Sequence, residues 1–220
     1  MRKALVIFFL CICGALLNVA LSLVSDIMAL PLFLDTILTV TVTLLSGPFW
    51  GAMTGALTNL IGHTLRFWGW EGYLFILANV ATAFLTWLFI RLFPRELSFA
   101  HRENRCDHHV PPKSRHFAMV MERVVVLTLF SFALCLTMSI LGGLIAVFIQ
   151  GINPVHAGEQ GLSPNIYFNM FSQGFPLILS EILVRIPMNI IDRLIAAFGG
   201  YGIALALQGV LRKTGIVYRT

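Results

Sequence analysis

The chain of 220 residues is too apolar for a soluble domain, since 58% of its residues are hydrophobic and only 11% are charged. A soluble protein of this length could not bury so much apolar surface. The net charge of +5 would suit a nucleic-acid-binding protein, but the basic residues flank apolar runs, where attraction to anionic lipid headgroups explains them. We therefore expect an all-α integral membrane protein, a single domain in the lipid bilayer, with no nucleic-acid partner.

The N-terminal part contains four apolar runs that approach the roughly 20 helical residues needed to cross a hydrocarbon core about 30 Å thick. The first resembles the apolar core of a signal peptide, but it is too long and lacks a convincing cleavage site before Pro31. The second and third form a tight hairpin around Gly47-Pro48, because proline suits the first turn of a helix. We predict these spans over residues 4–24, 30–46, 48–67 and 73–93.

The C-terminal part begins with a polar loop over residues 94–118, which we expect in the cytoplasm, and continues with a fifth span over 124–149. An outer loop over 150–165 follows without lysine or arginine. Residues 166–211 could form two spans, or one span after a surface or re-entrant helix.

Positive charge decides between these topologies. Lysine and arginine number two at the N-terminus, seven over residues 91–123 and three from residue 212. The positive-inside rule places all three segments in the cytoplasm. We therefore predict six transmembrane helices with both termini cytoplasmic, a last span over 187–211, and a partly inserted outer-side helix over 166–186.

This topology places polar side chains in the outer half of the bundle. Asn59, His63 and Arg66 share one helical face, as do Glu181, Arg185, Asn189 and Asp192. Because ionisable residues in a membrane are costly and usually face a bundle interior or a water-filled cavity, the pattern indicates a solute pocket that opens outward. The candidate substrate-binding residues are Asp35, Asn59, His63, Arg66, Trp68, Trp70, Glu71, Tyr73, Asn79, Arg185, Asn189 and Asp192. A ring with polar substituents fits this set best.

Two alternatives apply to these residues. The charges can form structural ion pairs, Asp35 with Arg66, and Glu181 or Asp192 with Arg185 or Arg193. The aromatic loop over residues 67–73 can be an interfacial belt as well as a stacking lid.

Small residues recur every four positions at Gly47, Gly51 and Gly55, and a weaker version occurs in the first span. Such spacing lets helix backbones approach closely. The stripe serves either packing within the bundle or docking of a membrane partner. The candidate partner-contact residues are Cys11, Gly14, Ala15, Gly47, Gly51 and Gly55.

Three motifs support a family resemblance: Leu-Asp-Thr at 34–36, Gly-Pro-x-x-Gly-Ala-x-x-Gly-x-x-Thr-Asn-Leu at 47–60, and Pro-x-Asn-x-x-Asp-Arg at 187–193. With the six predicted spans, the chain resembles the substrate-binding S component of an energy-coupling factor (ECF) transporter. The resemblance implies a bacterial cytoplasmic membrane protein that binds a vitamin or related heterocycle at its outer face. It also implies a transmembrane T component and two ATPase subunits as partners.

The resemblance assigns solute contacts to Arg185, Asn189, Asp192, Asn79 and the loop over residues 68–73. It assigns partner contact to the first span, where the family's Ala-x-x-x-Ala surface is replaced by Cys11-x-x-x-Ala15. The loop after Pro94 is longer than the family leads us to expect.

No enzyme motif is present, and no phosphate-binding loop, so we expect ATP hydrolysis from another chain and no cofactor. The cysteines lie too far apart for a disulfide framework. His and Cys residues within 101–109 match no closed zinc motif, so we predict no metal site. Two other functions stay open, a membrane ligand sensor and a stand-alone secondary transporter.

Overall fold

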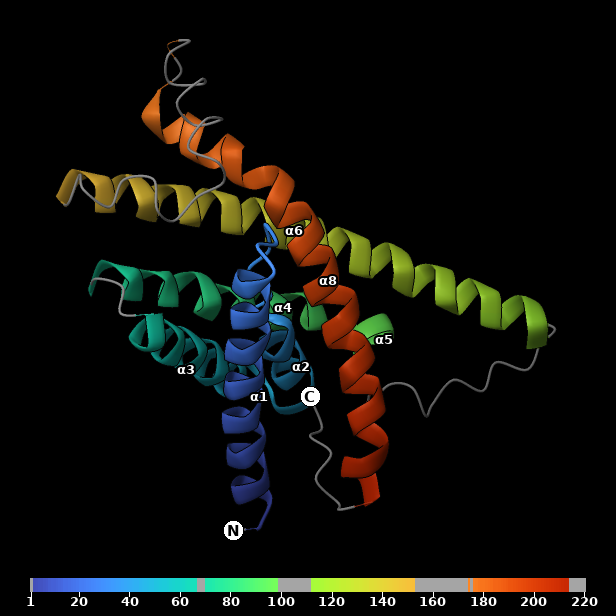
Figure 1. The fold of residues 1–220 in the computed structure, drawn as a ribbon. Helices are drawn as coiled ribbons and strands as arrows, with labels where there is room; N and C mark the ends of the chain where they lie inside the picture. Colours follow the sequence, from blue (N-terminus) through green and yellow to red (C-terminus); the bar gives the residue numbers. More distant parts are fainter. Residues whose placement is uncertain (1, 67–69, 99–111, 153–173, 175, 214–220) are drawn as a thin grey trace.

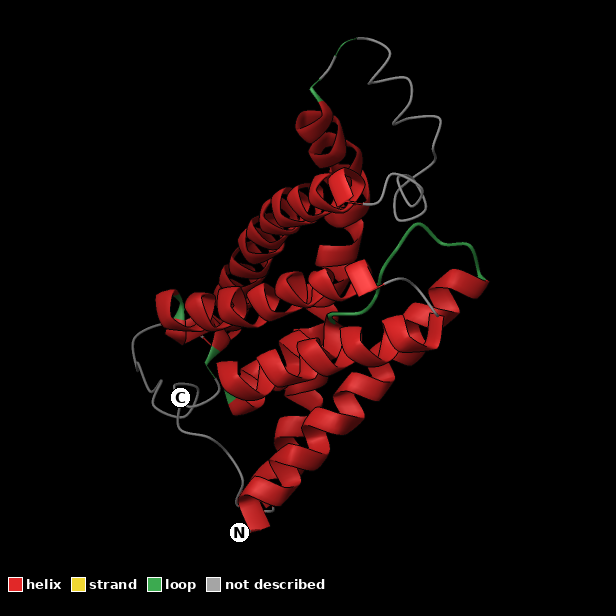
Figure 2. Cartoon of the chain, turned by 90° about the vertical axis from the view of Figure 1, so that its left-hand side faces the viewer, coloured by secondary structure: helices red, strands yellow, loops and turns green. Residues whose placement is uncertain are grey.

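The protein is described here by a computed structural model that covers residues 2–66, 70–98, 112–152, 174 and 176–213. Every regular element in these ranges is a helix (Figures 1 and 2), which confirms the all-α prediction for the described residues. The elements are α1 (Arg2–Ile27), α2 (Ile37–Ser46), α3 (Pro48–Arg66), the 3₁₀ helix η1 (Trp70–Phe75), α4 (Ile76–Leu92), α5 (Pro94–Leu97), α6 (Pro112–Ile152) and α8 (Leu177–Lys213).

Four helical stretches are long and apolar enough to cross a membrane: Ala4–Ile27, Trp70–Leu92, Phe117–Ile152 and Leu177–Leu211. Large apolar side chains are exposed on their surfaces, such as Phe9, Leu129 and Phe148. Water disfavours such a surface, whereas lipid accepts it. The chain is therefore a multi-pass membrane protein.

The predicted second span is shorter than the sequence indicates. Its helix, α2, begins at Ile37 rather than at residue 30, and its 10 residues are all buried. A helix of this length rises about 15 Å, roughly half of a hydrocarbon core. α2 packs against α1, α3, α4 and α8, so it lies in the centre of the bundle.

Asn18 of α1 fixes the start of α2. Its Oδ1 accepts a hydrogen bond from the Leu38 amide at 2.9 Å, and its Nδ2 donates to Thr39 Oγ1 at 3.2 Å and to Thr58 Oγ1 at 3.3 Å. The buried Asn18 side chain therefore accepts from a backbone N–H in the first turn of α2, which would otherwise lack a partner. The same side chain joins α1, α2 and α3.

α8 differs from the predicted arrangement because it is one helix that runs through Pro187. Proline removes one backbone hydrogen bond from a helix interior, but packing against a neighbouring helix can offset that loss. α6 provides this packing: a Cβ at Gly143 would lie 3.2 Å from the backbone nitrogen of Ile182, so the two helices approach closely. The predicted boundary between a partly inserted helix and a last span at Pro187 is thus not seen, and the part of that helix over 166–173 lies outside the described residues.

The predicted loop over 94–118 is shorter in the described structure, since α5 occupies its start and α6 begins at Pro112. Arg95 and Glu96, the first charged residues of this predicted loop, thus lie in a short separate helix. The cysteine and histidines of 101–109 lie outside the described residues.

The small residues of α1 and α3 serve packing inside the bundle. A Cβ at Gly51 would overlap Thr43 of α2, and one at Gly55 would lie 2.9 Å from the Asn79 carbonyl oxygen of α4. The residues predicted for partner contact are all buried within the chain: Cys11, Gly14, Ala15, Gly47, Gly51 and Gly55. These contacts fit the packing alternative, and docking of a membrane partner stays a prediction.

Candidate functional site

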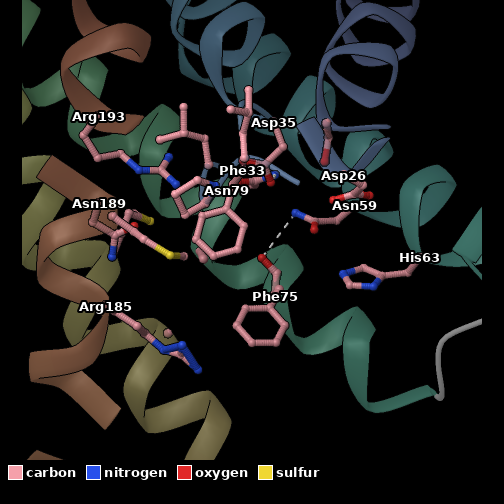
Figure 3. A pocket seen from close by; sticks show the side chains of 18 of the residues that line it. Asp26, Phe33, Asp35, Asn59, His63, Phe75, Asn79, Arg185, Asn189 and Arg193 are labelled. Carbon is pink, nitrogen blue, oxygen red and sulfur yellow. Dashed lines mark hydrogen bonds between the residues drawn. The ribbon is translucent and has the colours of Figure 1, made fainter. Parts of the chain in front are cut away.

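A cavity of about 420 Å³ lies between the segment that joins α1 to α2 and helices α3, α4, α6 and α8 (Figure 3). Its volume is in the roughly 300–1,000 Å³ range of small-molecule sites. The lining residues are Ser22, Asp26, Leu30, Pro31, Leu32, Phe33, Asp35, Asn59, His63, Arg66, Phe75, Ala78, Asn79, Met138, Gly142, Arg185, Met188, Asn189 and Arg193.

Most of the residues predicted for substrate binding meet at this cavity. The structure brings together Asp35, Asn59, His63, Arg66, Asn79, Arg185 and Asn189. It does not bring the aromatic loop with them: Trp70, Glu71 and Tyr73 do not line the cavity, and Trp70 is exposed. Trp68 lies outside the described residues. Asp192 is buried behind the wall of the cavity.

The α3 wall holds a line of polar side chains. Asn59 Nδ2 donates to the Phe75 carbonyl oxygen at 3.3 Å, and the His63 ring stacks on Phe75 with centroids 6.4 Å apart and planes at 25°. Gly72 leaves space for this imidazole, since a Cβ there would lie 2.7 Å from His63 Nδ1. η1 thus supports the cavity through its backbone and Phe75.

Arg66 closes one edge of the cavity together with α1. Its guanidinium contacts Asp26 Oδ2 at 2.6 Å and donates to Ser22 Oγ at 2.8 Å. One alternative interpretation of the sequence paired Arg66 with Asp35, but the structure pairs it with Asp26. Asp26 lies on the last turn of α1, where the spacing within one span could not identify it.

Asp35 instead lies between α2 and α4. Its Oδ2 accepts a hydrogen bond from Asn79 Nδ2 at 3.0 Å. Its other oxygen, Oδ1, is buried and has no hydrogen-bond partner within the described part of the chain. The carboxylate of this lining residue therefore keeps one unused acceptor.

Arg185 comes from α8 and lies flat against α6. Its Nη2 is 3.1 Å from Glu181 Oε2, and Glu181 Oε1 accepts a hydrogen bond from Gln150 Nε2 at 2.5 Å. A Cβ at Gly142 would lie 3.4 Å from Arg185 Cδ, an ordinary van der Waals contact, so the arginine packs against α6 at this position. Arg185 Nε is buried without a hydrogen-bond partner among the described residues.

Asn189, one turn further along α8, donates from Nδ2 to Ser139 Oγ of α6 at 2.9 Å. This bond fixes the orientation of an amide that also lines the cavity. Asn189 therefore connects α8 to α6 and also forms part of the cavity lining.

Asp192 and Arg193 hold the segment over residues 28–36 against α8. Asp192 Oδ1 accepts from the Phe33 amide at 3.1 Å and the Leu34 amide at 2.8 Å. Arg193 donates from Nη1 to Thr36 Oγ1 at 2.6 Å, and its Nη2 lies 2.9 Å from Asp192 Oδ2. Leu34 has φ of +50°, a strained value for a residue with a side chain. Asp192 thus positions a cavity wall and does not line the cavity.

No sequence pattern identifies the apolar part of the lining. Phe33, Phe75, Met138 and Met188 lie in apolar runs, where nothing distinguishes them from lipid-facing residues. Ser22 lies within the predicted first span and Asp26 two residues beyond its predicted end, but no spacing pattern marked either as a site residue. The aromatic surface of the cavity is therefore Phe33 and Phe75, whereas the sequence indicated tryptophans.

Comparison of the chain with protein-family models, with curated proteins and with solved structures finds no match. Function therefore has to be argued from the cavity and from the sequence motifs.

Proposed function

We propose that this protein binds a small water-soluble micronutrient, a vitamin or related heterocycle, in the cavity and serves its uptake across a membrane. The observation that carries the proposal is a cavity of about 420 Å³ with charged and amide side chains inside a bundle whose exterior is apolar. Polar groups in a membrane bundle are costly, and they commonly mark solute pathways. The volume suits a mono- or bicyclic ring with polar substituents.

The proposed machinery is an ECF transporter of a bacterial cytoplasmic membrane, with this chain as its S component. The motifs at 34–36, 47–60 and 187–193 support this assignment. A T component and two ATPase subunits would then supply the energy. In this proposal both termini are cytoplasmic, α2 and α3 together form the predicted second and third spans, and the cavity opens outward.

The binding function is tested by native mass spectrometry of the purified protein. We expect a small molecule that is released on unfolding. Ala78 of α4 lines the cavity, so Ala78→Phe should fill it and abolish the bound mass. Ala20→Phe on the exposed face of α1 is the matched control and should retain the bound mass. Equal occupancy in both variants, or no bound molecule in the wild type, would contradict the proposal.

The transporter assignment needs a separate test, because a sensor or a secondary transporter could also bind a solute. Affinity purification of the tagged chain from its own membranes, under mild detergent, should recover two ATPase subunits. Recovery of solute-loaded protein without any ATPase would favour one of the other two functions.

A further inference from the structure

Several buried side-chain atoms of residues that line the cavity lack a hydrogen-bond partner in the described ranges, among them Asp35 Oδ1, Arg185 Nε and Arg193 Nε. Asp35 precedes α2 and Arg185 lies on α8, so these two come from different parts of the cavity wall. Both residues line the cavity. Folded proteins rarely leave buried polar groups unpaired, and each exception requires an explanation. A bound ligand with complementary groups provides one for both atoms at once.

The two side chains are held in place by other contacts, so neither can easily turn to find a partner in the chain. Asn79 donates to the second oxygen of Asp35 at 3.0 Å. Glu181 holds the end of the Arg185 guanidinium at 3.1 Å, and the arginine side chain is only 6% exposed. Preorganised groups of this kind bind without a large ordering cost.

The charges of the two residues differ in how they are balanced. Glu181 offsets Arg185, so the unused Nε–H requires a hydrogen-bond acceptor more than it requires a full negative charge. Asp35 has no cationic group within ion-pair distance among the described residues, where Arg66, Arg185 and Arg193 each pair with another carboxylate. The Asp35 end therefore requires a donor, and favours one with positive charge.

Aromatic side chains lie between these two ends. Figure 3 shows the rings of Phe33 and Phe75 in the space between Asp35 and Arg185, with His63 beside Phe75. Aromatic rings favour stacked or edge contacts with other flat rings. The middle of the cavity is thus suited to a flat ring, and its ends to polar substituents.

We propose that the ligand is a flat aromatic molecule with a hydrogen-bond donor, an amino group or a ring N–H, against Asp35, and an acceptor oxygen of a carbonyl or carboxylate against Arg185. This inference rests on the proposed solute-binding function and names its substrate class. Asp35 accepts a hydrogen bond from the donor group of the ligand, and Arg185 donates one to its acceptor oxygen.

A probe series separates the two ends: 6-amino-2-naphthoate carries both groups, 2-naphthoate lacks the donor, and 2-amino-6-ethylnaphthalene lacks the acceptor. Dissociation constants are measured by titration of the detergent-purified protein freed of bound solute. The first probe should bind roughly tenfold to a hundredfold more tightly than either of the others, because each lost charge-assisted hydrogen bond weakens binding by about that factor. Equal affinity for all three probes overturns the inference.

Two conservative variants assign the ends. Asp35→Asn should weaken binding of the two amino compounds and leave 2-naphthoate unchanged. Arg185→Lys keeps a positive charge for Glu181 but loses the planar guanidinium. It should therefore weaken binding of both naphthoates and leave binding of 2-amino-6-ethylnaphthalene unchanged. Arg91→Lys, on an exposed part of α4, is the matched control. Equal weakening of all three probes in both variants would show that the residues shape the cavity without contacting the ligand.

The outcome also separates this inference from the proposed function. If no probe binds but native mass spectrometry finds a bound solute, the donor and acceptor assignment is wrong and solute binding stands. If neither a probe nor a solute binds, both proposals fail.

Discussion

Removing the Asp192 carboxylate should lower the stability of the fold and should not directly weaken ligand binding. Asp192 is 1% exposed, accepts two backbone hydrogen bonds from the segment before α2, and pairs with Arg193. Asp192→Ala would leave two amides without acceptors and the buried Arg193 guanidinium, 5% exposed, without its counter-charge. Breaking a buried pair from one side costs about 3–5 kcal/mol. This is a large fraction of the roughly 5–15 kcal/mol that holds a typical domain folded.

Three further variants determine the origin of that cost. Asp192→Asn keeps one acceptor oxygen, so we expect a smaller loss of about 1–3 kcal/mol. Asp192→Ala combined with Arg193→Leu removes both charges and should recover part of the stability of the single variant. Asp26→Ala breaks an ion pair whose carboxylate side chain is 54% exposed, and this control should cost at most about 1 kcal/mol.

The assay is thermal unfolding of each variant in detergent without solute, followed by solute binding to the protein that remains folded. We expect a lowered unfolding midpoint for Asp192→Ala, and a change in solute affinity only to the extent that the segment over 28–36 is displaced. A wild-type midpoint together with a tenfold or larger loss of affinity would refute it. Asp192 would then contact the solute, as the sequence indicated.

Three other tests concern the helix packing and the topology. Gly55→Ala places a Cβ 2.9 Å from a backbone oxygen of α4 and should lower the unfolding midpoint, whereas Gly202→Ala meets open space and should be neutral or stabilising by up to about 1 kcal/mol. Asn18→Leu should destabilise by about 1–3 kcal/mol, since it leaves the Leu38 amide without its acceptor, and circular dichroism of thermal unfolding measures this. In intact cells, a membrane-impermeant thiol reagent should label Ser163→Cys from outside but not native Cys106, and external labelling of Cys106 would exclude the six-span topology.

Side chains within one helix were predictable because helical geometry is local. Asn59, His63 and Arg66 follow a spacing that puts them on one face, and all three line the same cavity. Arg185 and Asn189 follow the same rule on α8. The apolar runs also identified the long helices, since their hydropathy depends on composition alone.

Pairings between helices were not predictable, because sequence spacing says nothing about which helices lie together. Arg66 pairs with Asp26, 40 positions away, and not with Asp35. Asp192 binds amides almost 160 positions away. Its spacing on α8 marked it as a functional residue, but only the fold shows that its partner is the backbone.

The late start of α2 explains why a cavity exists in this bundle. Backbone that is not helical is tolerated at membrane depth only where other groups satisfy its amides and carbonyls. Asp192 satisfies two amides of the segment before α2, and Ser25 Oγ donates to the Leu32 carbonyl oxygen at 2.5 Å. A helix beginning at residue 30 would satisfy these groups internally and would not need a buried carboxylate. The segment in its present form leaves α2 short and turns Phe33 and Asp35 toward α3, α4 and α8, where they become walls of the cavity. The charged pair on α8 thus holds the cavity wall in place, and under the proposed function a solute would contact the lining residues that this pair leaves free.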